Sequence, residues 1–352
     1  MKVSLIAGLA VSVVALQAHA ASFSDIIVFG DSLADKGRFP QTLVDPISGM
    51  PVPVIAPPSN DGRFTDGTTW LEQVGEVFEQ GGGQNYNMAV GGAVMSPVSS
   101  FVDNETDPSY AFVDSLVTRD PADPDDIPLL NLGTFDRQID AFTNAGFDKT
   151  LGDNPLFVIS LGSNDVFQRN EGDLTAVEDD VTEILKGLSD GIQKIQDLDM
   201  SFDNFIVTNL PFAGPTVAPI LQAYADEFDS QLAAYQSQLG FEIFDFAFAN
   251  FVAIQKGLLA GINLAACTAD LTPATPLDGI DPSKNQCLTP GSSSNFLFAD
   301  EVHPNSFIHT DLAGSFLTQL GSRAPAPIPL PAGLPLMGAA LVGLAVMRRR
   351  AK

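Results

Sequence analysis

A serine, an acid and a histidine, far apart in the chain, have the side chains that acyl transfer requires. Ser32 follows an apolar run in the motif Gly30-Asp31-Ser32, and Asp300 lies three residues before His303. A serine hydroxyl is a weak nucleophile at neutral pH, so it needs an imidazole to take its proton and a carboxylate to orient that imidazole. The sequence therefore predicts Ser32 as nucleophile, His303 as general base and Asp300 as the orienting acid.

The choice of His303 rests on the small number of histidines, of which there are three. His19 lies in a segment that we expect to be removed. His309 lies among apolar residues at roughly helical spacing behind Pro304, which is typical of a histidine that packs or is solvated on a helix. His303 precedes this predicted helix in a turn, where a side chain can project into a cleft. We therefore favour His303 as the base.

A rival nucleophile, Ser189, stands in a Gly-Leu-Ser-Asp-Gly motif at residues 187–191. This matches the G-x-S-x-G pattern of other serine hydrolases, which works only as a sharp turn between a strand and a helix. Apolar residues between Leu174 and Ile195 fall at helical spacing on both sides of this serine. Ser189 is therefore predicted to lie in a helix and not to act as the nucleophile.

The elements that must position these residues alternate between short apolar strands and longer helices. The predicted strands cover residues 25–29, 86–90, 156–161, 205–210 and 241–246, and the predicted helices cover 68–78, 134–145, 174–195 and 220–239. This alternation is typical of an open sheet with helices on both faces. We predict an α/β fold, a three-layer α/β/α sandwich with a mostly parallel, flavodoxin-like sheet.

Ligands of such sheets bind beyond the carboxyl ends of the strands. Ser32 follows the first predicted strand, Gly91 and Gly92 follow the second, and Asn164 follows the third. The three segments should therefore meet at one edge of the sheet.

Four short blocks resemble those of the GDSL, or SGNH, hydrolase family, over residues 25–320. Gly30-Asp31-Ser32-Leu33 matches the first block, residues 87–93 resemble the second, 162–165 match the third and 300–304 match the last. Residues 62–67 with Trp70, and residues 209–211, are similar to the branch that includes plant-type GDSL lipases and bacterial secreted lipase/acyltransferases. The continuation of the first block, Lys36-Gly37-Arg38, departs from the usual family pattern.

The resemblance implies a serine esterase or lipase that acts on carboxylic esters through an acyl-enzyme on Ser32, without a metal or cofactor. It implies an oxyanion hole formed by the backbone N–H groups of Ser32 and Gly92 and by the side-chain amide of Asn164. The ester substrate is left open between a lipid, an acetylated glycan and a polyester. Two alternatives remain: an acyltransferase that uses the same site, and a non-catalytic exported surface or matrix protein of the same fold.

The first residues predict export. Residues 1–20 have a lysine, an apolar stretch and a small-residue cleavage pattern, which are typical of a secretory signal peptide. The folded domain is predicted to span residues 21–322. In an oxidising compartment Cys267 and Cys287, the two cysteines of the chain, are expected to form a disulfide. The alternative is that they are unrelated thiols.

The last residues predict a second targeting element. An Ala/Pro linker covers residues 323–329, and an uncharged stretch of 18 residues, 330–347, precedes Arg348, Arg349 and Arg350. Such a stretch just spans a bilayer core, with the arginines on the cytoplasmic side. Residues 330–352 resemble a PEP-CTERM, or VPLPA-type, sorting tail, which implies an exosortase-like processing enzyme as a partner. A simple anchor in the inner membrane is the alternative, and either predicts a periplasmic, cell-surface or extracellular catalytic domain.

The charge of the chain excludes one class of partner. Its net charge is −26, and all 43 acidic residues lie between the two end segments, which hold five of the 17 basic residues. The body of the protein is therefore still more acidic than the whole chain. Such a field repels nucleic acid and anionic membrane surfaces, so no nucleic-acid partner is expected.

Overall fold

A five-stranded parallel sheet forms the middle layer of the protein in its computed structural model. The structure describes residues 22–38, 42–44, 51–53, 61–96, 126–169, 174–212, 217–267, 293–300 and 302–325. The strands are β1 (Ile26–Gly30), β4 (Asn85–Asn87), β5 (Leu156–Ser160), β6 (Phe205–Thr208) and β7 (Glu242–Phe244). Each lies within or overlaps a strand predicted from the sequence.

The strand order, β4-β1-β5-β6-β7, decides where a ligand can bind. Counted along the chain, this is the order of a flavodoxin-like sheet, in which the chain first moves to one side of β1 and then crosses to the other. Open parallel sheets bind ligands at that reversal, beyond the carboxyl ends of the strands. Here the reversal lies between β1 and β5, which are followed by Ser32 and Asn164.

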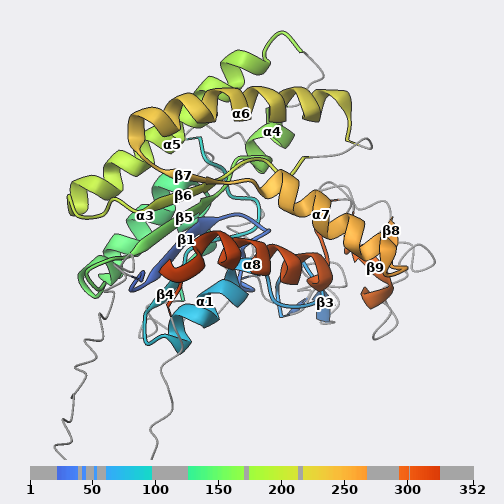
Figure 1. Ribbon diagram of the computed structural model, residues 1–352, viewed down its shortest axis with the longest axis horizontal. Coiled ribbons are helices and arrows are strands. Elements are labelled where there is room, and N and C mark those ends of the chain that lie inside the picture. Colours follow the sequence, from blue (N-terminus) through green and yellow to red (C-terminus); the bar gives the residue numbers. More distant parts are fainter. Residues whose placement is uncertain are drawn as a thin grey trace, which may run out of the picture.

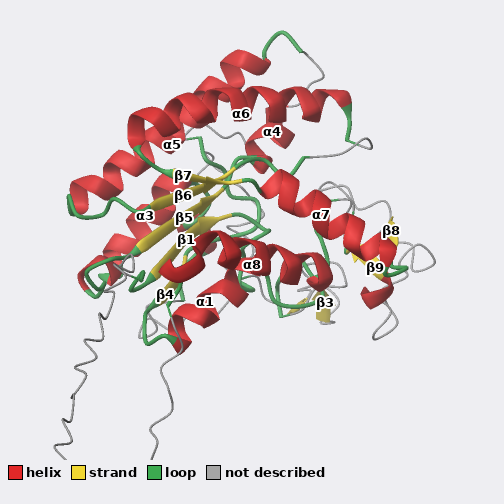
Figure 2. Cartoon of the chain, in the orientation of Figure 1, coloured by secondary structure: helices red, strands yellow, loops and turns green. Residues whose placement is uncertain are grey.

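Helices cover both faces of the sheet, as Figures 1 and 2 show. On one face α3 (Phe135–Asn144), α5 (Val177–Leu198) and α6 (Pro219–Leu239) pack on one large group of buried apolar side chains. On the other face α1 (Trp70–Gln80), α7 (Phe246–Leu259) and α8 (Ser306–Leu320) enclose a second group. The predicted three-layer α/β/α sandwich is confirmed.

Shorter elements lie around the sheet. Among the described residues they include a short helix, α4 (Ser163–Arg169), an antiparallel pair, β2 (Thr42–Val44) with β3 (Pro51–Pro53), a parallel pair, β8 (Asn263–Ala266) with β9 (Phe296–Phe298), and 3-10 turns at Leu129–Asn131, Phe147–Lys149, Ser293–Asn295 and Gly321–Arg323. The helix α4 directly follows β5 and therefore begins at the edge of the sheet where the predicted site lies.

The last predicted strand, residues 241–246, is too long. The strand β7 ends at Phe244, because the carboxylate of Asp245 accepts the N–H of Phe248 at 3.0 Å and so caps the first turn of α7. The helix α7 was not among the predicted elements, and its first residue is Phe246.

The carboxyl end of the described chain packs on the domain. The Arg323 guanidinium pairs with Glu242, its carbonyl accepts the N–H of Phe23 at 2.8 Å, and Pro325 is buried against Gly81. The sequence places the start of the linker at residue 323, whereas these contacts extend the domain to Pro325. Within the described ranges no helix is long and apolar enough to cross a membrane. The predicted signal peptide and sorting tail lie outside those ranges.

Candidate active site

The structure brings Ser32, His303 and Asp300 into one chain of hydrogen bonds. The Ser32 hydroxyl lies 2.8 Å from Nε2 of His303, and Nδ1 of His303 lies 2.7 Å from Oδ2 of Asp300. With its proton on Nδ1, the imidazole donates to Asp300 and leaves Nε2 free to accept the Ser32 proton. This arrangement can activate a serine hydroxyl for attack on a carbonyl carbon.

A tight turn after β1 holds Ser32 at the sheet edge. The Asp31 carboxylate accepts the N–H of Leu33 at 3.0 Å, and the Asp31 carbonyl accepts the N–H of Ala34. A Cβ on Gly30 would come within 2.9 Å of the Ala34 side chain and 3.1 Å of that of Ala89. Glycine therefore lets the turn pack closely, and Asp31 supports the turn.

A second turn presents the histidine. One oxygen of Asp300 accepts the backbone N–H groups of Val302 at 2.8 Å and His303 at 2.7 Å, which leaves the other oxygen for the imidazole. Burial disfavours the charged form of each partner. Their attraction outweighs that cost, so the pKa of Asp300 is held below its usual range and the pKa of His303 is raised above 6.5.

Phe64 completes the surroundings of the imidazole, and its place was not foreseen. Its ring centroid lies 5.0 Å from that of His303. Nearby, Arg63 pairs with Glu72 of α1, and Asp66 accepts the first N–H of α8 at 2.7 Å. The segment thus fixes one side of the base. The resemblance of the Gly-Arg-Phe-Thr-Asp-Gly stretch at residues 62–67 to GDSL lipases is the sequence signal for this part of the site.

The three predicted oxyanion donors lie on adjacent segments. The backbone N–H groups of Ser32 and Gly92 have no hydrogen-bond partner among the described residues. The Asn164 side-chain amide donates one N–H to the carbonyl of Ala93 at 2.9 Å, which leaves its second N–H for another acceptor. Gly92 has φ of 82°, a left-handed conformation that favours glycine. These segments therefore offer two backbone N–H groups and one amide N–H that could serve as oxyanion donors.

Two further acids lie buried at this edge. Burial raises the pKa of Asp31 to about 7, against the opposing effects of the Leu33 N–H and of His303. Burial also raises the pKa of Asp165, whose carboxylate accepts the N–H groups of Met95 and Ser96 at 2.7 and 2.9 Å. Asp165 therefore fixes the loop that follows Gly92.

The two alternatives raised by the sequence have structural explanations. His309 is buried in α8, where its Nδ1 accepts the N–H of Trp70 at 3.2 Å. Ser189 lies in the middle of α5, as predicted. The glycines on either side of it serve packing, because a Cβ on Gly187 would meet the Met95 carbonyl at 2.4 Å and one on Gly191 would meet the Phe135 ring at 2.2 Å.

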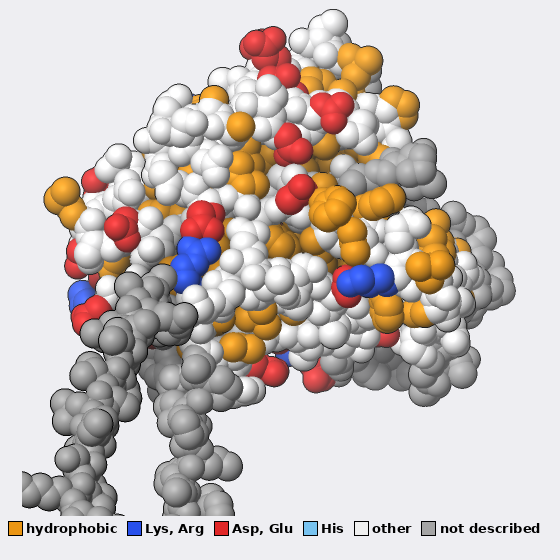
Figure 3. Space-filling view, in the orientation of Figure 1, with side chains coloured by type: hydrophobic (Ala, Val, Ile, Leu, Met, Phe, Trp, Pro, Cys, Tyr) orange, Lys and Arg blue, Asp and Glu red, His pale blue; other side chains and the backbone are white. Residues whose placement is uncertain are grey.

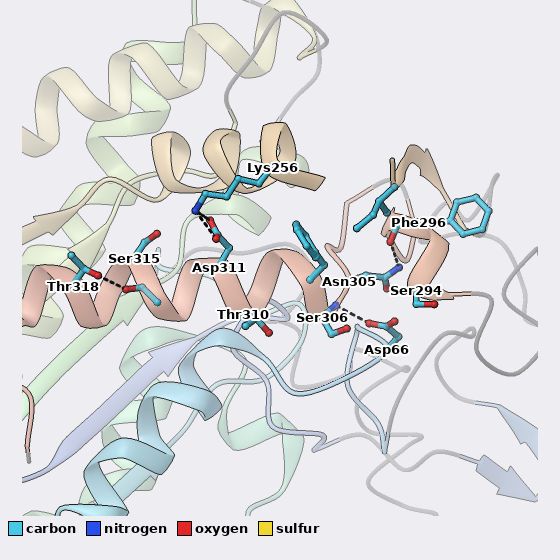
Figure 4. A pocket seen from close by; sticks show the side chains of 13 residues that line it. Asp66, Lys256, Ser294, Phe296, Asn305, Ser306, Thr310, Asp311, Ser315 and Thr318 are labelled. Atoms are coloured by element: carbon cyan, nitrogen blue, oxygen red, sulfur yellow. Dashed lines mark hydrogen bonds and ion pairs between the residues drawn. The ribbon is translucent and has the colours of Figure 1, made fainter. Parts of the chain in front are cut away.

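A hollow of about 650 Å³ runs along α8, beside the site and separate from it. Figure 4 shows its polar wall, with the Lys256–Asp311 ion pair at one side and Asp66 bonded to the N–H of Ser306. Ser32, Asp300 and His303 do not line it.

The surface is acidic around its few basic groups. Figure 3 shows one face, on which the Lys and Arg side chains lie beside Asp or Glu. Within the described ranges, no group of three or more His, Cys, Asp or Glu side chains is placed to hold a metal ion.

Cys267 is buried and disulfide-bonded. Its predicted partner, Cys287, lies outside the described residues, so this pairing stays a prediction.

Comparison with known proteins gives a family and several similar proteins. Residues 26–313 match the GDSL-like Lipase/Acylhydrolase family. A phosphatidylcholine-sterol acyltransferase from Aeromonas hydrophila is 30% identical over 122 residues, a match that spans 33% of either protein. Similar solved structures include an acetylxylan esterase from Geobacillus stearothermophilus, with 14% identity and a TM-score of 0.41 over 86% of this chain and 96% of that one. Another is a putative GDSL-like lipase from Parabacteroides merdae, with 11% identity and a TM-score of 0.42 over 86% and 99%.

The family match spans most of the chain and includes the segments that carry Ser32, Gly92, Asn164 and His303. This protein belongs to the GDSL-like lipase/acylhydrolase family.

Proposed function

We propose that the protein is a serine esterase that hydrolyses carboxylic esters through an acyl-enzyme on Ser32. The observation that carries the proposal is the unbroken chain from the Ser32 hydroxyl through His303 to Asp300, with bonds of 2.8 and 2.7 Å. Membership of the GDSL-like family supports ester chemistry at this serine.

In the first half of the reaction, Ser32 Oγ attacks the ester carbonyl while His303 Nε2 takes its proton. The imidazolium then gives this proton to the leaving alcohol as the C–O bond breaks and the acyl-enzyme forms. In the second half, His303 takes a proton from water, the resulting hydroxide attacks the acyl carbon, and the proton returns to Ser32. Asp300 stabilises the imidazolium in both halves and stays ionised, which agrees with its lowered pKa.

The oxyanion formed in each half would be held by the N–H groups of Ser32 and Gly92 and by the Asn164 amide. Each such donor contributes about 3 kcal/mol to lowering the barrier, because it is aimed at charge that develops only in the transition state. The absence of any other partner for the two backbone N–H groups among the described residues supports this role.

An acyltransferase is the second candidate. The match to a phosphatidylcholine-sterol acyltransferase favours it, although that match spans a third of either protein. The chemistry differs only in the second half, in which an alcohol replaces water. The acyl substrate stays open between a lipid, an acetylated glycan and a polyester, and the plant-type branch of the family stays a prediction.

We also propose export, with residues 1–20 as signal peptide and residues 330–352 as a sorting tail or anchor. The apolar stretches in the sequence support the proposal, as does the disulfide of Cys267, which is typical of oxidising compartments. A periplasmic, cell-surface or extracellular location would follow, with an exosortase-like enzyme acting on the tail.

The test uses nitrophenyl esters with acyl chains from acetyl to palmitoyl. Purified protein should release nitrophenol, and Ser32→Ala should not. Added alcohols separate the two candidates: an acyltransferase diverts the acyl group to the alcohol at the expense of free acid, whereas a hydrolase forms free acid alone. Equal turnover by Ser32→Ala would contradict both.

A further inference from the structure

A buried carboxylate next to the nucleophile turn binds the segment that carries Gly92. Asp35 is fully buried, and one of its oxygens accepts the N–H groups of Gly37 and Arg38, each at 2.9 Å. Its other oxygen accepts the N–H of Gly91 at 2.8 Å. The same side chain therefore joins the turn after β1 to the residue directly before Gly92.

Arg38 contacts the same segment through two backbone carbonyls. Its Nε donates to the carbonyl of Ala89 at 3.1 Å, and its Nη2 donates to the carbonyl of Asn87. This arginine is part of the Lys36-Gly37-Arg38 stretch in which the sequence departs from the usual family pattern. The planar guanidinium holds two carbonyls that lie two residues apart, which a lysine ammonium cannot reproduce.

The backbone from Asn87 to Ala93 is thus held at nearly every position. The N–H groups of Met88 and Val90 donate to β1 at 2.8 and 3.2 Å, and that of Ala93 donates to the Val90 carbonyl. Asp35 takes the N–H of Gly91. The N–H of Gly92 is left as the donor without a partner in this segment of the described chain.

We propose that Asp35 and Arg38 are positioning residues that fix the Gly92 N–H toward the oxyanion of the ester reaction. The inference rests on the proposed function and adds to it two residues that do not touch the substrate. They act through the backbone that leads to the donor: Arg38 holds the carbonyls of Asn87 and Ala89, and Asp35 holds the N–H of Gly91, directly before Gly92.

The physical reason is that an oxyanion donor works only when it is already in place. Such a donor stabilises the transition state because the protein does not have to reorganise during the reaction. A shift of about 1 Å in a positioned group can cost about 100-fold in rate. Loosening the segment should therefore lower kcat and leave KM nearly unchanged, because the substrate carbonyl itself carries little charge.

The chain offers a matched control in Asp25, at the opposite end of β1. It is also buried, with 3% of its surface exposed, and its two oxygens accept the N–H groups of Gln84 at 2.8 Å and Gly152 at 2.7 Å. Both carboxylates accept backbone N–H groups with both oxygens. An asparagine at residue 25 or residue 35 has only one acceptor oxygen, so its NH₂ group must face one of the backbone N–H groups. Asp25→Asn and Asp35→Asn thus cause the same local damage at opposite edges of the sheet.

The experiment compares Asp35→Asn, Arg38→Lys and Asp25→Asn in the full protein. The concentration of active sites is measured by titration with a fluorophosphonate, and kcat is calculated per active site, so that misfolded molecules do not lower its value. For each variant, kcat and KM are measured on a nitrophenyl ester, together with the inhibition constant of a trifluoromethyl ketone, whose adduct with the serine places an oxyanion in the site.

We expect kcat per active site to fall about 10- to 100-fold in Asp35→Asn, with KM changed less than about threefold and inhibitor affinity lowered by the factor lost in kcat. Arg38→Lys should change the same quantities in the same direction by a smaller factor. Asp25→Asn should lower the melting temperature and keep kcat per active site within about twofold.

Equal kcat per active site in Asp35→Asn and Asp25→Asn would overturn the positioning role while leaving the esterase proposal intact. If Asp35→Asn yields no active sites, Arg38→Lys decides alone: unchanged kcat and inhibitor affinity there would refute the inference. A wild-type protein that neither hydrolyses esters nor reacts with the fluorophosphonate would refute the proposed function, and the inference with it.

Discussion

His309 should make the protein less stable in acid without taking part in catalysis. Its side chain is 1% exposed, and its Nδ1 accepts the N–H of Trp70 at 3.2 Å. If Nδ1 were protonated, its N–H would face the backbone N–H of Trp70 and the hydrogen bond between them would be lost in a buried environment. Burial therefore lowers the pKa of His309 from 6.5 to about 3.

The size of the effect follows from proton linkage. The unfolded chain takes up a proton at His309 near pH 6.5 and the folded protein does not, so stability is lost as the pH falls below that value and the loss is complete near pH 3. Between about pH 7 and about pH 5 the loss amounts to about 2 kcal/mol. The stability lost at pH 5 depends almost wholly on the pKa of His309 in the unfolded chain, because His309 is still neutral in the folded protein at that pH.

The assay is urea unfolding of wild type and His309→Gln at both pH values. Carboxylates titrate in both proteins, so the quantity to compare is the difference in unfolding free energy between them. This difference should shift by about 2 kcal/mol in favour of the variant on going from about pH 7 to about pH 5. A constant difference would refute the reasoning. A folded but inactive variant would show that the base is His309.

Three further outcomes follow from the site and its surroundings. Asp300→Asn should lower kcat by up to about 10⁴-fold, and the acid limb of its pH–rate profile should move to lower pH, because the carboxylate raises the pKa of His303. A profile that moves to higher pH would contradict this. Asn164→Ala should lower kcat about 100- to 1,000-fold with KM little changed, and a change in KM alone would remove it from the oxyanion hole. Removal of residues 326–352 should give a soluble, active protein, whereas removal from residue 323 should also lower the melting temperature, because it removes the contacts of Arg323 with Glu242 and Phe23 and the packing of Pro325; equal melting temperatures would show that these contacts add nothing.

Much of the fold was predictable because the strands β1, β5 and β6 are short apolar runs with polar turns after them. The helix α7 escaped notice because Phe246–Leu259 is apolar around most of its circumference, so it lacks the clear period that marks α1 or α5. Phe248 and Leu259 are exposed on it, with 63% and 89% of their surfaces accessible. The helix α4 is too short to show a period at all.

The reacting groups of the site were predictable from residue type and spacing, since few chemistries pair a serine after a strand with an Asp-x-x-His turn. The residues that hold these reacting groups in place were not predictable. Asp35 and Arg38 differ from other acids and arginines only in the backbone groups that they reach, and Phe64 only in its closeness to His303. Such relations arise from tertiary packing, which a pattern along the chain does not encode.

Trapping the nucleophile tests the central claim most directly. The protein is treated with a fluorophosphonate, its intact mass is measured, and the modified peptide is sequenced in wild type, Ser32→Ala, His303→Ala and Ser189→Ala. We expect a single adduct on Ser32, absent in Ser32→Ala, strongly slowed in His303→Ala and unchanged in Ser189→Ala. An adduct on another residue, or one that persists in a folded Ser32→Ala protein, would contradict the assignment of Ser32 as the nucleophile.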